Sequence, residues 1–123
     1  MSDTEKTIFN MTEKELIDYC LTYEAAFLDY PFDEETAVIR HSSNKKMFAL
    51  IGTSRNKVGI NLKCEPLRAE ILRDNYKSVE TGWHMNKKHW ITVYVGGDVS
   101  EEELHEMIDH SYDLIKPKTK RKR

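Results

Sequence analysis

The first feature of the chain is an amphipathic helical pattern close to its N-terminus. Thr12 and Glu15 have the spacing of a capping box, in which the hydroxyl and the carboxylate bind the first free amides of a helix. Apolar side chains then recur at intervals of four, three and four residues: Leu16, Cys20, Tyr23 and Phe27. This is the spacing of one helical face, and the segment Tyr30-Pro31-Phe32 ends it because the residue before a proline avoids the helical conformation. The pattern predicts a helix over residues 12–28.

Three short apolar or alternating runs follow, at residues 37–40, 47–51 and 58–63. Two polar segments, residues 42–45 and 53–57, separate the runs and have the composition of turns. The pattern predicts an antiparallel β meander.

A second helix is predicted over residues 66–75, because Pro66 suits the first turn of a helix. Three residues give this helix an apolar side: Leu67, Ile71 and Leu72. Residues 90–94 then have the pattern of a strand, which the glycines of Gly96-Gly97-Asp98 end with a turn.

The last helix is predicted over residues 100–116, with Ser100 and Glu103 as a second capping box. Its buried face is expected to hold Leu104, Met107, Ile108, Ser111 and Ile115. The order α-β-β-β-α-β(β)-α predicts an α+β fold in which helices back an antiparallel sheet. We expect one domain over residues 1–116 and a basic, flexible tail over residues 117–123.

Composition indicates a globular protein, since 123 residues can bury a core. The longest apolar run, Phe48–Ile51, is too short to cross a bilayer, and the polar N-terminus lacks the apolar core of a signal peptide. We therefore expect a cytoplasmic protein without a membrane partner. Cys20 and Cys64 match no metal-ligand spacing, so we expect reduced core thiols and folding without metal, cofactor or disulfide.

The net charge of −2 conceals an uneven distribution of charge along the chain. Residues 37–94 carry 11 basic and 4 acidic side chains, a net +7, whereas residues 1–36 carry 2 basic and 10 acidic ones, a net −8. Because local potential steers a charged ligand more than net charge does, the central block predicts a face that attracts a polyanion. The alternative is that the blocks neutralise each other across the folded surface.

Residues 82–90, Gly-Trp-His-Met-Asn-Lys-Lys-His-Trp, hold the most distinctive chemistry of the chain. Gly82 permits a tight turn, so that Trp83 can project and stack on a base. The alternative is that Trp83 packs over a neighbouring helix. Trp90 opens a strand, and we expect it to be a core residue.

Lys87 and Lys88 of this segment can contact phosphates. The alternative is that they are ordinary surface lysines that keep the protein in solution. Asn86 can reach a base edge or a phosphate, or its side chain can shape a turn. The predicted phosphate-binding residues are Lys46, Lys63, Arg73, Lys87 and Lys88. For Arg73 the alternative is a salt bridge with an acidic neighbour.

Catalysis by His84 or Cys64 is the weakest hypothesis, and we expect no enzyme. His84 and His89 have no carboxylate or thiolate near them in sequence, and their spacing matches no zinc pattern. Lys63 can lower the pKa of the Cys64 thiol, but Cys64 ends an apolar strand, where a buried thiol is inert.

Several segments together form a specific pattern, and the string His-Met-Asn-Lys-Lys-His-Trp is its most specific part. The others are residues 30–32, 46–49, 62–73, 76–79 and 111–114. With this string they resemble the MmcQ/YjbR-like family of small bacterial proteins. Three positions depart from the family pattern: Asp33 stands where glycine is common, Thr81 where proline is common, and Trp83 where tyrosine is common.

The resemblance implies an α+β fold of the secretion-chaperone-like type. It also implies DNA binding, because members of the family are often labelled so. We therefore expect a monomeric DNA-binding protein of weak sequence selectivity that uses its basic face and residues 82–90. The alternative is a protein-interaction module that docks an acidic partner on the same segment.

Overall fold

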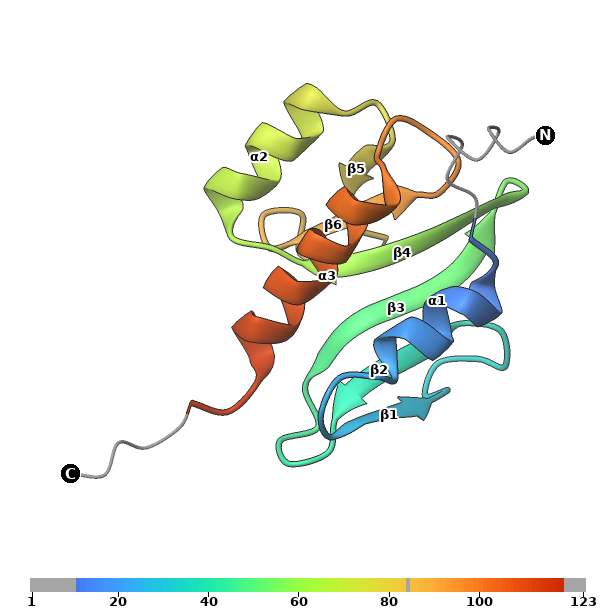
Figure 1. The fold of residues 1–123 in the computed structure, drawn as a ribbon, viewed down its shortest axis with the longest axis vertical. Coiled ribbons are helices and arrows are strands. Elements are labelled where there is room, and N and C mark those ends of the chain that lie inside the picture. Colours follow the sequence, from blue (N-terminus) through green and yellow to red (C-terminus); the bar gives the residue numbers. More distant parts are fainter. Residues whose placement is uncertain (1–10, 84, 119–123) are drawn as a thin grey trace.

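The computed structural model describes residues 11–83 and 85–118 (Figure 1). Its elements in chain order are α1 (Glu13–Cys20), β1 (Ala26–Asp29), β2 (Ala37–His41), β3 (Met47–Ser54), β4 (Lys57–Lys63), α2 (Pro66–Asn75), β5 (Val79–Thr81), β6 (Trp90–Tyr94) and α3 (Glu101–Ile115). They form one α+β domain.

A six-stranded antiparallel sheet organises the domain, with the strand order β1-β2-β3-β4-β6-β5. The predicted meander is confirmed, because β2, β3 and β4 pair in sequence order. After α2 the chain forms the edge strand β5 and then β6, which lies between β5 and β4. The helices cover one face: α1 packs on β2 and β3, α3 on β3 and β4, and α2 beside β5 (Figure 1).

Alternation along the strands divides the apolar residues between the two faces of the sheet. Residues such as Ile51, Ile60 and Val93 point toward the helices and form the main core. The opposite face, which we call the open face, carries a row of paired residues across four strands: Val38, Leu50, Asn61 and Thr92. Among the described residues no helix covers this face.

Trp90 is buried as expected, with 8% of its surface exposed, but it belongs to the open face. It packs with Val38 and Leu50, and the partly buried Met47 and Met85 cover this small second cluster.

Both predicted capping boxes are confirmed. Thr12 and Glu15 exchange side-chain and backbone hydrogen bonds at the start of α1, and Ser100 and Glu103 do so at the start of α3. α2 has the predicted bounds, since Pro66 occupies its first turn. The two capping boxes fix a helix start because they satisfy amides that have no partner within the helix. Pro66 acts differently, because it has no amide hydrogen to satisfy and its fixed φ suits the first turn.

The prediction of a first helix extending to residue 28 is wrong. α1 ends at Cys20, Ala25 adopts a left-handed φ of 65°, and residues 26–29 form β1 instead. β1 pairs with β2 along its whole length, so its backbone amides and carbonyls gain partners in the sheet. Tyr23 still packs against the core residue Phe48, as a helical side chain would, but from a turn.

The predicted apolar side of α2 is also wrong. Leu67 and Ile71 are 69% and 50% exposed, whereas Ala69 is fully buried and Leu72 only partly so. A small residue lets α2 approach the sheet closely, and this packing rather than the hydrophobic spacing sets the orientation of the helix.

The described part of the chain contains no helix with the length and apolar character needed to cross a membrane. Of the predicted tail, Pro117 and Lys118 are described and exposed. Residues 119–123 and the first ten residues lie outside the described part.

Asp98 joins the turn after β6 to the segment before β5, and its carboxylate should make the stability of the fold depend on pH. Its carboxylate accepts backbone hydrogen bonds from Lys77 N (2.7 Å) and Ser78 N (2.9 Å), and the Lys77 bond most of all holds the pKa of Asp98 below 3.8. Because the folded-state pKa is the lower one, the stabilisation is present above pH 3.8 and is lost as the pH falls through the folded-state pKa. Asp98→Asn cannot accept both bonds, so its melting temperature should lie below that of wild type at pH 7. This difference in melting temperature between wild type and Asp98→Asn should become smaller in acid. A difference that does not change with pH would contradict the role of the Asp98 carboxylate.

Candidate nucleic-acid interface

The segment before β6 forms a tight turn that presents two lysines. Asn86 Oδ1 accepts a hydrogen bond from Lys88 N (2.9 Å), and Asn86 O accepts one from His89 N (3.1 Å). Cys64 N donates to His89 O (2.8 Å), which ties the turn to the end of β4. Lys87 and Lys88 are both exposed in this turn. Asn86 therefore shapes the turn, and its exposed amide nitrogen remains able to donate a hydrogen bond.

Strand register brings Lys46 and Lys63 to the same end of the sheet. Lys63 is the last residue of β4 and pairs with Trp90, the first residue of β6. Lys46 immediately precedes β3, which runs antiparallel to β4, so β3 begins where β4 ends. Lys46 is exposed and Lys63 half-buried. We call the group formed by Lys46, Lys63, Lys87 and Lys88 the lysine end.

The C-terminal end of α3 also lies at the lysine end. Asn44, in the turn between β2 and β3, donates a side-chain hydrogen bond to Ile115 O (2.8 Å). Lys116 and Lys118 follow directly and are exposed. The basic tail of the sequence therefore leaves the domain beside the turn that holds Lys46.

Trp83 lies apart from these lysines, on the open face of the sheet. Its backbone N donates to Asn61 Oδ1 (2.7 Å), and its indole Nε1 donates to the Tyr94 hydroxyl (3.2 Å). The indole extends over Gly59, four residues before Lys63, which corresponds to about 13 Å along an extended strand. Trp83 is half-buried and packs on strands. The two hypotheses from sequence are stacking on a base and packing over a helix, and the strand contact differs from both.

Arg73 is the one predicted phosphate-binding residue that lies outside the lysine end. It occupies the last turn of α2, a helix that begins just after β4 and belongs to the helical layer. Its side chain is half-buried, and Nη1 is buried with no hydrogen-bond partner among the described residues. The structure therefore does not group Arg73 with the exposed lysines.

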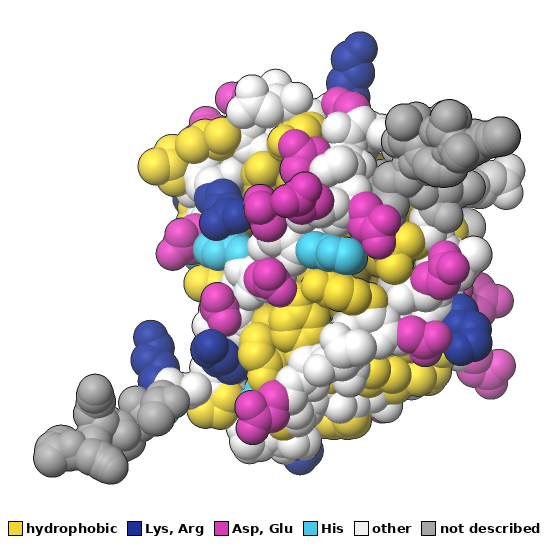
Figure 2. Space-filling view, in the orientation of Figure 1, with side chains coloured by type: hydrophobic (Ala, Val, Ile, Leu, Met, Phe, Trp, Pro, Cys, Tyr) yellow, Lys and Arg dark blue, Asp and Glu magenta, His cyan; other side chains and the backbone are white. Residues whose placement is uncertain are grey.

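The helical face carries mainly negative charge. Figure 2 views the molecule from this side and shows Asp and Glu side chains spread over the region of α1 and α3. Exposed acidic residues of α3 account for much of this: Glu101, Glu102, Glu106, Asp109 and Asp113. A polyanion is repelled by such a surface, so its favourable approach is toward the lysine end.

Burial opposes a nucleophilic role for either cysteine. It raises the pKa of Cys20 to about 12, and it raises the pKa of Cys64 more than Arg68 and Arg73 lower it. His89 is exposed, and His84 lies outside the described residues. In the described part of the chain no three His, Cys, Asp or Glu side chains are grouped to hold a metal.

Sequence reasoning missed two residues in the turn beside the lysine end, Lys45 and Asn44. Lys45 adjoins Lys46 in the predicted turn, so its cationic character was visible. The anchoring role of Asn44 had no local signal, because its partner Ile115 lies 71 residues away.

The described residues form a small single α+β domain, with three helices on one face of an antiparallel sheet and a group of lysines at one end of that sheet. The family model described as YjbR matches residues 21–114, and the chain belongs to the YjbR family. The family resemblance and the predicted fold class are thus confirmed.

Relatives from two bacteria have comparable length. The Escherichia coli (strain K12) protein YjbR is 31% identical over 115 residues, covering 91% of this chain and 96% of the relative. The Bacillus subtilis (strain 168) protein YyaQ is 35% identical over 100 residues, covering 72% of this chain and 84% of the relative.

Solved structures show the same fold. A crystal structure of a Deinococcus radiodurans protein matches with a TM-score of 0.76 and 36% identity, covering 85% of this chain and 78% of that one. A crystal structure of a Pseudomonas syringae protein matches with a TM-score of 0.75 and 31% identity, covering 86% and 100%.

Proposed function

We propose that the protein binds DNA through the lysine end of its sheet. The observation that carries the proposal is the convergence of three separate chain segments: Lys46 before β3, Lys63 at the end of β4, and the exposed pair Lys87 and Lys88. When clustered lysines bind phosphates, the counterions condensed on the DNA are released, and this release drives association with any DNA sequence. The acidic helical face then restricts DNA to this end of the molecule.

The geometry favours backbone contact with duplex DNA over stacking on unpaired bases. Trp90 is buried, and Trp83 is fixed over Gly59 at a distance from the lysines. Trp90 pairs with Lys63 but is buried, so no exposed tryptophan lies beside the phosphate-binding side chains, as one would in a protein that stacks the bases of a single strand. Phosphate contacts carry no sequence information, which agrees with weak sequence selectivity.

The test replaces Lys87 and Lys88 together by alanine. Affinity for unrelated duplexes should fall by similar factors, because each duplex loses the same phosphate contacts. The plot of log affinity against log salt concentration should flatten by about one unit for each lost contact. Fluorescence anisotropy of labelled duplexes over a series of low salt concentrations measures both quantities.

The matched control is the double variant Arg55→Ala/Lys57→Ala. It removes the same charge from the β3–β4 hairpin, at the opposite end of the sheet, where both residues are exposed. We expect the control to bind DNA nearly as wild type does. Equal losses in the two double variants would place the interaction elsewhere, and failure of wild type to bind any duplex at low salt would end the DNA hypothesis.

The second candidate function is docking of an acidic protein segment at the same end. Met47 and Met85 lie partly exposed over Trp90 beside these lysines, and methionine adapts its shape to varied protein partners. Competition separates the two functions: a polyglutamate peptide that binds with higher affinity than duplex DNA of equal charge would favour the protein ligand.

A further inference from the structure

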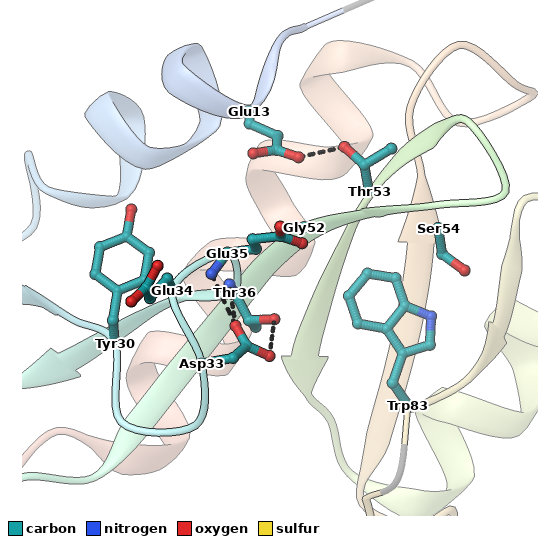
Figure 3. Close-up of a pocket in the computed structure, with 10 residues that line it drawn as sticks. All are labelled: Glu13, Tyr30, Asp33, Glu34, Glu35, Thr36, Gly52, Thr53, Ser54 and Trp83. Atoms are coloured by element: carbon teal, nitrogen blue, oxygen red, sulfur yellow. Dashed lines mark hydrogen bonds between the residues drawn. The ribbon is translucent and has the colours of Figure 1, made fainter.

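The loop before β2 and the indole of Trp83 line a hollow of about 660 Å³ beside the last residues of β3 (Figure 3). Gly52 to Ser54 of β3 also line it, and Glu13 at the start of α1 lines it from the helical side of the sheet, where its carboxylate accepts a hydrogen bond from the Thr53 hydroxyl. The volume is within the usual range for small-ligand sites. The hollow is separate from the lysine end, so a ligand bound in it leaves the lysines free.

Gly59, one of two paired glycines, explains why Trp83 can lie in this position. Gly52 and Gly59 pair directly across β3 and β4, and neither has a positive φ that would itself require glycine. A Cβ added to Gly59 would lie 3.0 Å from Trp83 Cζ2, and one added to Gly52 would lie 3.9 Å from Cζ3. Glycine weakens a strand interior, so the presence of Gly59 is accounted for by the close approach of the indole, whereas the distance at Gly52 is an ordinary van der Waals contact.

Hydrogen bonds fix the orientation of this indole. The backbone bond to Asn61 and the Nε1 bond to Tyr94 hold both ends of the Trp83 residue, and its six-membered ring lies against Gly59. Trp83 also lines the hollow. An aromatic wall that is rigid before binding costs a ligand little ordering entropy.

The charge of the hollow is negative on two sides. Glu13 contributes from α1, and Asp33, Glu34 and Glu35 contribute from the loop, while no lysine or arginine among the described residues lines it. Asp33 has a structural role, since its Oδ1 accepts bonds from Glu35 N (2.9 Å) and Thr36 N (2.7 Å). Carboxylates alone are an ordinary solvated surface, but an adjacent fixed indole adds a specific preference for flat cations.

We propose that this hollow binds a guanidinium group, stacked on Trp83 and paired with the carboxylates of Glu34 and Glu35. A guanidinium is planar, weakly hydrated and able to stack on an aromatic face while its edge donates to carboxylates. The group can belong to a small free guanidine or to an arginine side chain of a protein segment.

A proton–nitrogen correlation NMR spectrum of the nitrogen-labelled full chain tests the site directly. The protein has two tryptophans and hence two indole N–H signals. N-acetyl-arginine amide should shift the Trp83 signal in a saturable manner at low salt and leave the Trp90 signal nearly unchanged. N-acetyl-citrulline amide, which has a similar shape but no charge, should shift neither. A Trp83→Phe spectrum assigns the two signals.

Charge and shape are then tested separately. Glu34→Gln/Glu35→Gln should weaken arginine amide roughly tenfold, since each partly exposed ion pair contributes a factor of a few. Glu70→Gln/Glu102→Gln, which removes equal charge from α2 and α3, should change affinity less than twofold. Gly59→Ala keeps every carboxylate but displaces the indole, and it should also weaken binding.

Several results would overturn the site: no saturable shift of the Trp83 signal, an equal shift with citrulline amide, or equal losses in the two glutamine variants. Titration with agmatine and with a blocked Arg-Arg dipeptide identifies the source of the group. Tighter agmatine binding assigns a small guanidine, and tighter dipeptide binding assigns a protein segment; either result supports the site.

Discussion

Trp90→Ala is expected to lower the free energy of unfolding by about 3–5 kcal/mol. Only 8% of the Trp90 surface is exposed, and the ring packs with Val38 and Leu50 on the open face. Loss of the indole removes the largest member of this second cluster. Because Met47 and Met85 are partly buried and flexible, they can fill part of the space, which favours the lower end of the range.

Equilibrium unfolding in denaturant measures this change, with Trp90→Phe as the control. Phenylalanine retains an aromatic ring and should restore more than half of the lost stability. A loss near zero for Trp90→Ala would show that the cluster is loosely packed and that the open face does not contribute to folding. Retained DNA binding in Trp90→Phe would further show that the residue supports the lysine end by packing alone.

The capped helices could be predicted from sequence because their signals are local. Ser100 and Glu103 satisfy amides only a few residues away, and Pro66 favours the start of α2 because its fixed φ already suits a helix. The N-terminal helix could not be delimited, since Tyr23 packs like a helical residue after the helix has ended. The strand pairing of residues 26–29 with β2 decided the outcome, and such pairing is not visible in the spacing of one segment.

The candidate site shows the same division between local and long-range causes. Sequence identified Lys87 and Lys88 by their position in a turn, and Asn86 as the residue that can shape it. Their grouping with Lys46 depends on the register of β3, β4 and β6, which no single segment specifies. The position of Trp83 depends on Gly59, a strand residue 24 positions earlier whose importance appears only when both are placed on one face.

Ser111→Ala is expected to lower the free energy of unfolding by about 2–3 kcal/mol, more than an ordinary surface hydroxyl contributes. Ser111 is fully buried in α3, where sequence placed it on the buried face. Its Oγ donates to Phe48 O (2.6 Å) and accepts from Lys63 N (2.9 Å). One hydroxyl therefore joins the start of β3 to the end of β4, and alanine leaves both backbone groups without this partner.

The comparison variant is Ser100→Ala, which removes one cap from the same helix and should cost about 1 kcal/mol. The two serines differ in burial and in the number of partners, so denaturant unfolding should give the larger loss for Ser111→Ala. Hydrogen exchange supplies a local readout: the amide of Lys63 should exchange faster in Ser111→Ala, whereas the same amide should be unaffected in Ser100→Ala. Equal exchange in both variants would mean that Ser111 does not hold the end of β4, and the backbone of Lys63 at the lysine end would then depend on its pairing with Trp90 alone.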